Sequence, residues 1–341
     1  MSNTPAPVRR ACRVLLSALP VVVSVTAVTT TPAFAAEAVC TVDGQSVHGS
    51  TINGTDGDNE FICSEIPRGA VINARGGNDR ITVTARPGKI GNRGEINGGT
   101  GNDTIIVRGG DGNRPGAAGA AGNTGEIYGG SDSSDTIVVT GGEGRAGAPG
   151  SGLTCQSGGK GGAGNDGRIS AHGSISVTGG AGARGADRTG KKEDCDGGDG
   201  GDGNADRIIG TGPGSVVEAL GGAGGLGIQS GEGGDGGNGN NGHITIENGA
   251  QNSIAVRATG GHGGNGGSRG DTGYLGGGGN GGNGNNSKID IDKAGKGYVK
   301  GGDGGNGQPA GKGGKGNTHK GSITAPEGYE APGGNDGAST T

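Results

Sequence analysis

The stretch Gly98-Gly99-Thr100-Gly101-Asn102-Asp103-Thr104-Ile105-Ile106-Val107 is a glycine-rich turn that leads directly into a short apolar strand. Similar strands recur along the chain. Aligned on Ile105-Ile106-Val107 they are Phe61-Ile62, Ile81-Thr82-Val83, Ile137-Val138-Val139, Ile175-Ser176-Val177, Val216-Val217, Ile254-Ala255-Val256 and Tyr298-Val299. Repetition of one turn-and-strand unit in this way predicts a repeat architecture.

A second set of short strands precedes the first. Its members are Val71-Ile72, Glu95-Ile96, Ile127-Tyr128, Arg168-Ile169, Ile208-Ile209, Ile244-Thr245-Ile246, Ile289-Asp290-Ile291 and the unpartnered Ile323. The step from the second set to the first is often close to nine residues, as from Ile72 to Ile81 and from Ile96 to Ile105. β-Branched strands at this step, joined by Gly/Asn/Asp turns, favour an all-β parallel β-solenoid whose rungs share one narrow core. Antiparallel hairpins in a sandwich are the alternative.

Composition excludes several classes of protein. The chain has 341 residues, of which 92 are glycine, 12 are proline and 2% are aromatic, so a conventional globular core is not expected. Collagen is rejected because its strict triplet period and high proline content are missing. The net charge of -5 and the lack of a basic, aromatic-rich stripe give no support for binding nucleic acid. Disordered low-complexity sequence is opposed by the periodic Ile and Val positions.

The chain divides into three predicted parts. Residues 1–35 have the charged start, apolar middle and Ala33-Phe34-Ala35 end of a secretory signal peptide. Residues 36–324 are the repeat domain, and residues 325–341 are expected to be a disordered tail. No later stretch approaches the roughly 20 apolar residues of a membrane span. The protein is therefore expected outside the cytoplasm, secreted or associated with the cell surface.

Long insertions with a Gly-Gly-X texture follow the rungs, for example Gly233-Gly234-Asp235-Gly236-Gly237-Asn238. A period of three with two glycines suits closely packed polyproline II strands, which turn once every three residues. We expect each insertion to go out and return as an extended hairpin, and successive hairpins to stack into a layer. The alternative is a set of flexible loops.

The cysteines test this stacking. Cys12 leaves with the signal peptide, and the four that remain permit three pairings. Cys155 and Cys195 lie 18 residues after Ile137 and 20 residues after Ile175, at nearly the same place in consecutive insertions. Stacked hairpins therefore predict a Cys155–Cys195 disulfide, and by elimination Cys40 pairs with Cys63. An exported protein would meet an oxidising compartment that permits both bonds.

The opening stretch matches the nonapeptide G-G-x-G-x-D-x-U-x of the repeats-in-toxin (hemolysin-type) calcium-binding proteins, and related turns extend over about residues 53–139. The resemblance implies that Asp79, Asp103 and Asp135 bind Ca²⁺ together with turns one rung away, since Ca²⁺ takes about six to eight oxygens. The alternative is that these aspartates are turn formers bonded to their own backbone. The acidic run Glu193-Asp194-Cys195-Asp196, with Asp199 and Asp202, is a second cation site or a solvated loop.

The Gly-Gly-X insertions resemble the polymorphic glycine-rich repeat domains of bacterial surface proteins, those of mycobacteria among them. They are also similar to the glycine-rich polyproline II sandwiches of phage adhesins and springtail antifreeze proteins. These resemblances imply a rigid layer that carries function on its exposed face. No catalytic motif is found, so we expect a secreted, non-enzymatic protein with a structural, adhesive or surface-interaction role and a cell-surface or extracellular polymer as partner. A calcium-binding repeats-in-toxin-like module and a polysaccharide-acting solenoid enzyme are the alternatives.

Overall fold

The computed structural model describes residues 36–130, 134–148, 155–186, 195–269 and 274–339, which fall within one unit of the chain, Ala35–Thr341. The predicted signal peptide, residues 1–35, lies outside the described residues. Within the described residues, no helix is long and apolar enough to cross a membrane.

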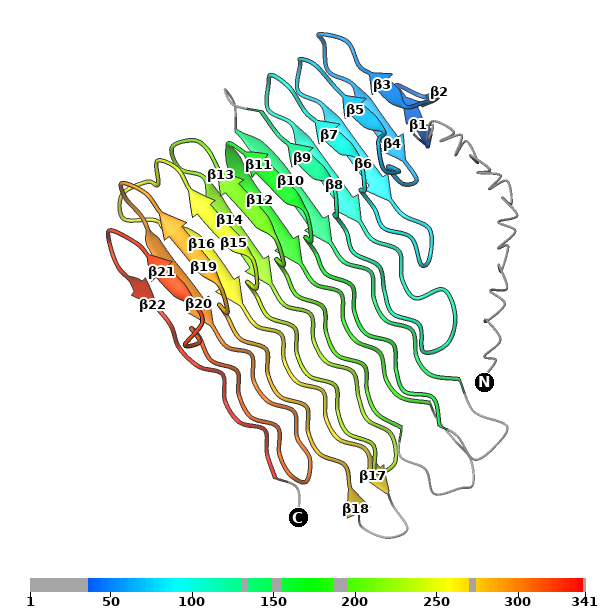
Figure 1. Ribbon diagram of the computed structural model, residues 1–341, viewed down its shortest axis with the longest axis vertical. Coiled ribbons are helices and arrows are strands. Elements are labelled where there is room, and N and C mark those ends of the chain that lie inside the picture. Colours follow the sequence, from blue (N-terminus) through cyan, green and yellow to red (C-terminus); the bar gives the residue numbers. More distant parts are fainter. Residues whose placement is uncertain (1–35, 131–133, 149–154, 187–194, 270–273, 340–341) are drawn as a thin grey trace, which may run out of the picture. The chain divides into compact units, whose positions relative to one another are not determined.

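One long sheet contains the first set of predicted strands (Figure 1). From β4 onward its neighbouring strands are parallel, and the residues aligned in the sequence are register partners, as in Ile81, Ile105 and Ile137. In order these strands are β4 (Glu60–Cys63), β6 (Arg80–Thr84), β8 (Thr104–Arg108), β10 (Asp135–Thr140), β12 (Gly173–Thr178), β14 (Val216–Leu220), β16 (Ile254–Thr259), β20 (Lys296–Lys300) and β22 (Tyr329–Glu330).

A second parallel sheet contains the other set. Its strands are β3 (Thr51–Asn53), β5 (Val71–Asn73), β7 (Glu95–Asn97), β9 (Glu126–Tyr128), β11 (Arg168–Ala171), β13 (Arg207–Gly210), β15 (His243–Ile246), β19 (Lys288–Ile291) and β21 (Ser322–Thr324). Strand β3 is the one member that the sequence patterns did not reveal.

Columns of aliphatic side chains fill the space between the two sheets. Each rung contributes residues from both sheets. Examples are Ile96 from β7 and Ile105 from β8, and both side chains are fully buried. Because register partners lie one above another, each rung completes the core of its neighbours, which no isolated rung could form. The parallel β-solenoid is therefore confirmed, and the antiparallel sandwich is excluded by the parallel pairing of consecutive rungs.

An antiparallel hairpin covers the first rung. It consists of β1 (Ala38–Val42) and β2 (Gln45–Gly49), and β1 pairs antiparallel with β4. Cys40 and Cys63 are register partners in this pairing and form the predicted disulfide. The hairpin thereby closes the N-terminal edge of the long sheet, which would otherwise offer unpaired backbone groups.

The C-terminal segment differs from the expected disordered tail. Residues 325–339 begin a further rung, in which β22 pairs with β20. Beyond it the N–H groups of Gly334 and Gly337 donate to the carbonyls of Gly314 and Gly311. The segment lies against the preceding rung because its glycines allow close backbone packing, as at Gly334, where a Cβ atom would lie 1.9 Å from Gly302 O, and composition alone did not distinguish this from a flexible tail.

The insertions form what we call the glycine layer, defined as the described residues of 109–122, 141–164, 179–203, 221–239, 260–284, 301–316 and 332–338. Each of the first six segments goes out from the solenoid and returns, and the hairpins lie side by side along the stack (Figure 1). One of them has a short antiparallel pair at its tip, β17 (Ser268–Arg269) with β18 (Tyr274–Leu275). The expected stack of extended hairpins is therefore present.

Candidate functional site

The three predicted calcium-binding aspartates lie in one column of the solenoid. Asp79 and Asp103 come directly before β6 and β8, and Asp135 is the first residue of β10. Their exposed fractions are only 2%, 1% and 1%. The structure therefore brings all three together on consecutive rungs, below the surface of the turns.

Each carboxylate links its rung to the one before it. The Oδ1 atoms of Asp79, Asp103 and Asp135 accept the backbone N–H groups of Asn59 (2.7 Å), Asp79 (2.8 Å) and Asp103 (3.1 Å). The turn-former interpretation expects bonds to each residue's own backbone, and these Oδ1 bonds run to the neighbouring rung. The reason is register, because stacking places the N–H group of one column residue beside the side chain of the next.

Burial changes the acidity of Asp79 in this column. Removal from water raises the pKa of Asp79 to about 6, and the charges of Asp58 and Asp43 act in the same direction, while the N–H group of Asn59 opposes the shift. At Asp103 the second carboxylate oxygen lies against Gly98, where a Cβ atom would come within 2.4 Å of it. The glycine in the motif is thus required by the packing of the aspartate.

The carboxylate oxygens of Asp79, Asp103 and Asp135 fit a hydrogen-bonding role better than they fit a calcium-binding cage. Ca²⁺ takes about six to eight oxygens, whereas each turn contributes one buried carboxylate whose Oδ1 already accepts an N–H group. In the part of the chain that the structure describes, no group of three or more His, Cys, Asp or Glu side chains is placed to hold a metal ion. Calcium binding remains a prediction that the chelation experiment below tests.

A ladder of asparagines, buried except at its last member, runs along the opposite turns of the solenoid and was not found from the sequence. Each Nδ2 group donates to the Oδ1 atom of the next member at 2.8–2.9 Å. The members are Asn92, Asn123, Asn165, Asn204, Asn240, Asn285 and Asn317. The available signal was an asparagine three residues before most strands of the second set.

The glycine layer is held by hydrogen bonds that repeat every third residue. In a triplet such as Lys160-Gly161-Gly162, the N–H group of Gly161 donates to Asp199 O on the next hairpin, and that of Gly162 donates to Gly142 O on the other arm, both at 2.8 Å. The packing leaves no room for larger residues. A Cβ atom on Gly180 would lie 1.9 Å from Gly142 O, so this close approach requires glycine.

Third-position residues of the triplets form rows on the two faces of the layer. One row on the returning arms contains Lys160, Asp199, Asp235, Asn280 and Lys312, and one on the outgoing arms contains Glu143, Ala181, Ala223, His262 and Asp303. None of these residues is buried. Because hairpins follow the solenoid rungs, neighbours in a row are spaced by about 4.8 Å.

The acidic run belongs to the returning face. Oδ1 atoms of Asp196, Asp199 and Asp202 accept backbone N–H groups of Glu232, Asp235 and Asn238 on the next hairpin. Lys160 pairs with Asp199 at 2.7 Å. Glu193 and Asp194 lie outside the described residues. The described members of the run are thus regular side-chain links between hairpins.

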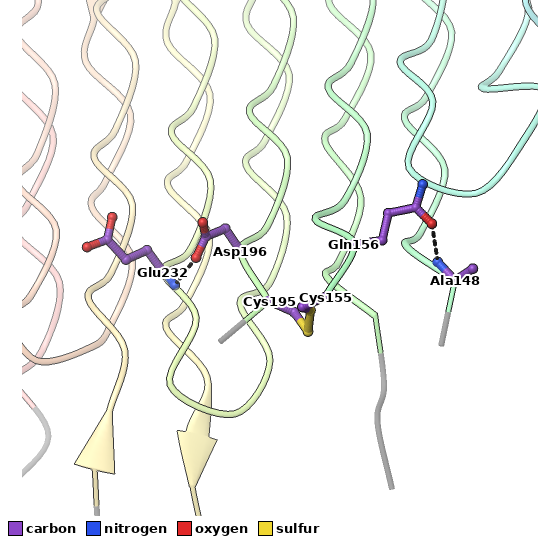
Figure 2. The surroundings of a disulfide bond; sticks show 6 residues. All are labelled: Ala148, Cys155, Gln156, Cys195, Asp196 and Glu232. Atoms are coloured by element: carbon purple, nitrogen blue, oxygen red, sulfur yellow. Dashed lines mark hydrogen bonds between the residues drawn. A yellow bond between two sulfur atoms is a disulfide. The ribbon is translucent and has the colours of Figure 1, made fainter. Parts of the chain in front are cut away.

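A disulfide ties two neighbouring hairpins together. Cys155 and Cys195 are bonded as predicted, and Asp196, next to Cys195 in the chain, accepts the N–H group of Glu232 on the following hairpin (Figure 2). Cys195 is fully buried, and its backbone also pairs with Ile228. The two disulfides of the structure are consistent with an oxidising environment.

A groove of about 410 Å³ crosses five successive turns of the solenoid. Its floor includes Gly94, Gly125 and Gly167, and its charged lining residues are Arg93, Glu95, Glu126, Arg168 and Asp206. Glu95 and Glu126 are register partners, and the Tyr128 hydroxyl donates to Glu126 Oε2. An open groove with both signs of charge, running along the rungs, can contact an extended polar chain.

Comparison with protein-family models, curated proteins and solved structures finds no match for this chain. Its parallel stacked strands and asparagine ladder are those of a repeat solenoid, and its membership of the repeats-in-toxin family is not shown.

Proposed function

We propose that the protein is a secreted, non-enzymatic platform that contacts a cell-surface or extracellular polymer. The observation that carries this proposal is the backbone-to-backbone packing of the glycine layer, which directs every third side chain to a face. A rigid layer of this kind presents the same type of contact many times, so weak contacts with a repeating partner add together.

The groove along the turns supports a linear partner. Its lining residues come from consecutive rungs, so a bound chain would lie parallel to the stack. Arg93 and Glu126 offer donors and acceptors to neutral or charged polymers. The predicted signal peptide and the two disulfides support secretion.

The experiment is co-sedimentation of the protein with isolated cell walls and with purified insoluble polysaccharides. We expect retention of the protein, and a lower retained fraction for the groove variant Arg93→Ala/Glu126→Ala. The matched control is Glu218→Ala/Arg257→Ala, which removes one partly exposed charge of each sign from β14 and β16, outside both the groove and the glycine layer. If no envelope or polymer retains the protein, the platform proposal fails. Release of reducing ends from a retained polysaccharide would instead support the enzyme alternative.

A further inference from the structure

We propose that the column Asp79, Asp103 and Asp135 is a metal-independent interlock. In it, side-chain oxygens join consecutive rungs through backbone N–H groups, in the place where the repeats-in-toxin resemblance implies bridging calcium ions. The inference is independent of the proposed platform function, since it concerns what holds the turns together.

The first argument is that the column performs the same task with three different acceptors. Register extends it from Asp135 to Gly173 and Ser215 on the next rungs. Asp135 N–H donates to the carbonyl of His172 at 2.6 Å, and Gly173 N–H donates to the hydroxyl of Ser215 at 3.2 Å. The N–H groups of successive column residues thus bond to a side-chain carboxylate, to the backbone carbonyl of His172 and to a side-chain hydroxyl, so the column requires an acceptor for each N–H group and does not require a charge.

The N-terminal end of the column supports the same interpretation. Asn59 occupies the place of the aspartate, and its Nδ2 group donates to Asp43 of the covering hairpin at 2.9 Å. The other oxygen of Asp43 accepts the N–H group of Glu60 at 2.8 Å. The column therefore begins at an amide and a carboxylate that bind each other, an arrangement that needs no bridging cation.

The same turns contain a second column, in which each backbone N–H group donates to a side chain of the preceding rung and not of the next one. Asn78 N–H donates to Asp58 Oδ1 at 2.6 Å, and Asn102 N–H donates to Asn78 Oδ1 at 2.8 Å. Ser134 N–H continues the series to Asn102 Oδ1 at 3.0 Å. The acceptors in this column are one aspartate, Asp58, and two asparagines, Asn78 and Asn102, so a charge is again not required. Each pair of rungs is thus linked twice, once toward the next rung and once toward the preceding rung.

The test compares Asp103→Asn with Asp103→Ala in the oxidised protein, with calcium chloride or with EGTA in excess. Asp103→Asn keeps the Oδ1 acceptor, so we expect a melting temperature close to that of the native protein in both solutions. Asp103→Ala removes it, and we expect a melting temperature lower by about 5 °C and hydrogen exchange at the Asp79 N–H faster by about tenfold.

Ser215→Ala is the second variant, because it also removes a side-chain acceptor of a column N–H group, here without removing a charge. It keeps the proposal testable if Asp103→Ala does not fold. It should speed exchange at the Gly173 N–H and leave Asp79 unchanged. The proposal is overturned if calcium raises the melting temperature of the native protein and Asp103→Asn abolishes that rise. It is also overturned if Asp103→Asn is as unstable as Asp103→Ala, since the charge would then be essential.

Discussion

Asn165→Ala should weaken the middle of the solenoid more than any change at the end of the asparagine ladder. Asn165 accepts from Asn123 and donates to Asn204, both at 2.8 Å. It also donates to Gly167 O at 2.7 Å and accepts Gly167 N–H at 3.3 Å. At about 0.5–1.5 kcal/mol for each hydrogen bond, the loss of four predicts a destabilisation of about 2–6 kcal/mol.

The matched control is Asn317→Ala at the last position of the ladder. Asn317 takes part in two comparable bonds, from Asn285 at 2.9 Å and to Gly321 O at 3.1 Å. The same arithmetic predicts a loss of about 1–3 kcal/mol. Asn317 is also less buried than Asn165, so water replaces part of what is lost.

The assay is urea unfolding followed by circular dichroism, together with hydrogen exchange resolved by rung. Exchange is needed because repeat arrays can open locally. We expect faster exchange in the rungs of Asn123, Asn165 and Asn204, with the N-terminal cap unchanged. The reasoning is refuted if Asn165→Ala unfolds within about 0.5 kcal/mol of the native protein, or if Asn317→Ala is equally destabilising.

Three further predictions concern other parts of the molecule. Gly180→Ala should disorder the glycine layer, because its Cβ atom would lie 1.9 Å from Gly142 O, whereas Gly333→Ala, whose nearest atom is 3.5 Å away, should be neutral; thermal melts of the two variants decide this. The pKa of Asp79, raised from 3.8 to about 6, means that the folded state holds its proton more tightly than the unfolded state. Its contribution is therefore greatest below about pH 3.8, is lost as the pH rises to about 6, and amounts to as much as about 3 kcal/mol. Asp79→Asn should remove this slope from a stability–pH profile, and an unchanged profile would contradict the assignment. Cys155→Ser/Cys195→Ser should lower the stability by about 2–4 kcal/mol and speed exchange near residues 156–163 and 196–203, while a uniform effect over all rungs would count against a local tie.

The sequence by itself determined the architecture. Short Ile- and Val-rich strands at a step near nine residues identified the strands of both sheets apart from β3, β22 and the covering hairpin of β1 and β2, because a solenoid core needs an aliphatic side chain at the same place in every rung. The Gly-Gly-X period indicated the hairpins, and the equivalent places of Cys155 and Cys195 indicated which hairpins are neighbours. These features are local or strictly repeated, so they can be read without knowledge of the fold.

The tertiary structure alone decided which polar groups meet. Ladder asparagines are separated by 31 to 45 residues, and the insertions vary in length, so no fixed period marks them. Only the register of the strands brings Asn165 beside Asn204, and Asp103 beside the backbone of Asp79. The same turn sequence is compatible with a calcium ligand, a bond to its own backbone or a bond to the preceding rung. Stacking provides the last of these contacts for the described aspartates, because it places an N–H group of the preceding rung within reach of each buried carboxylate.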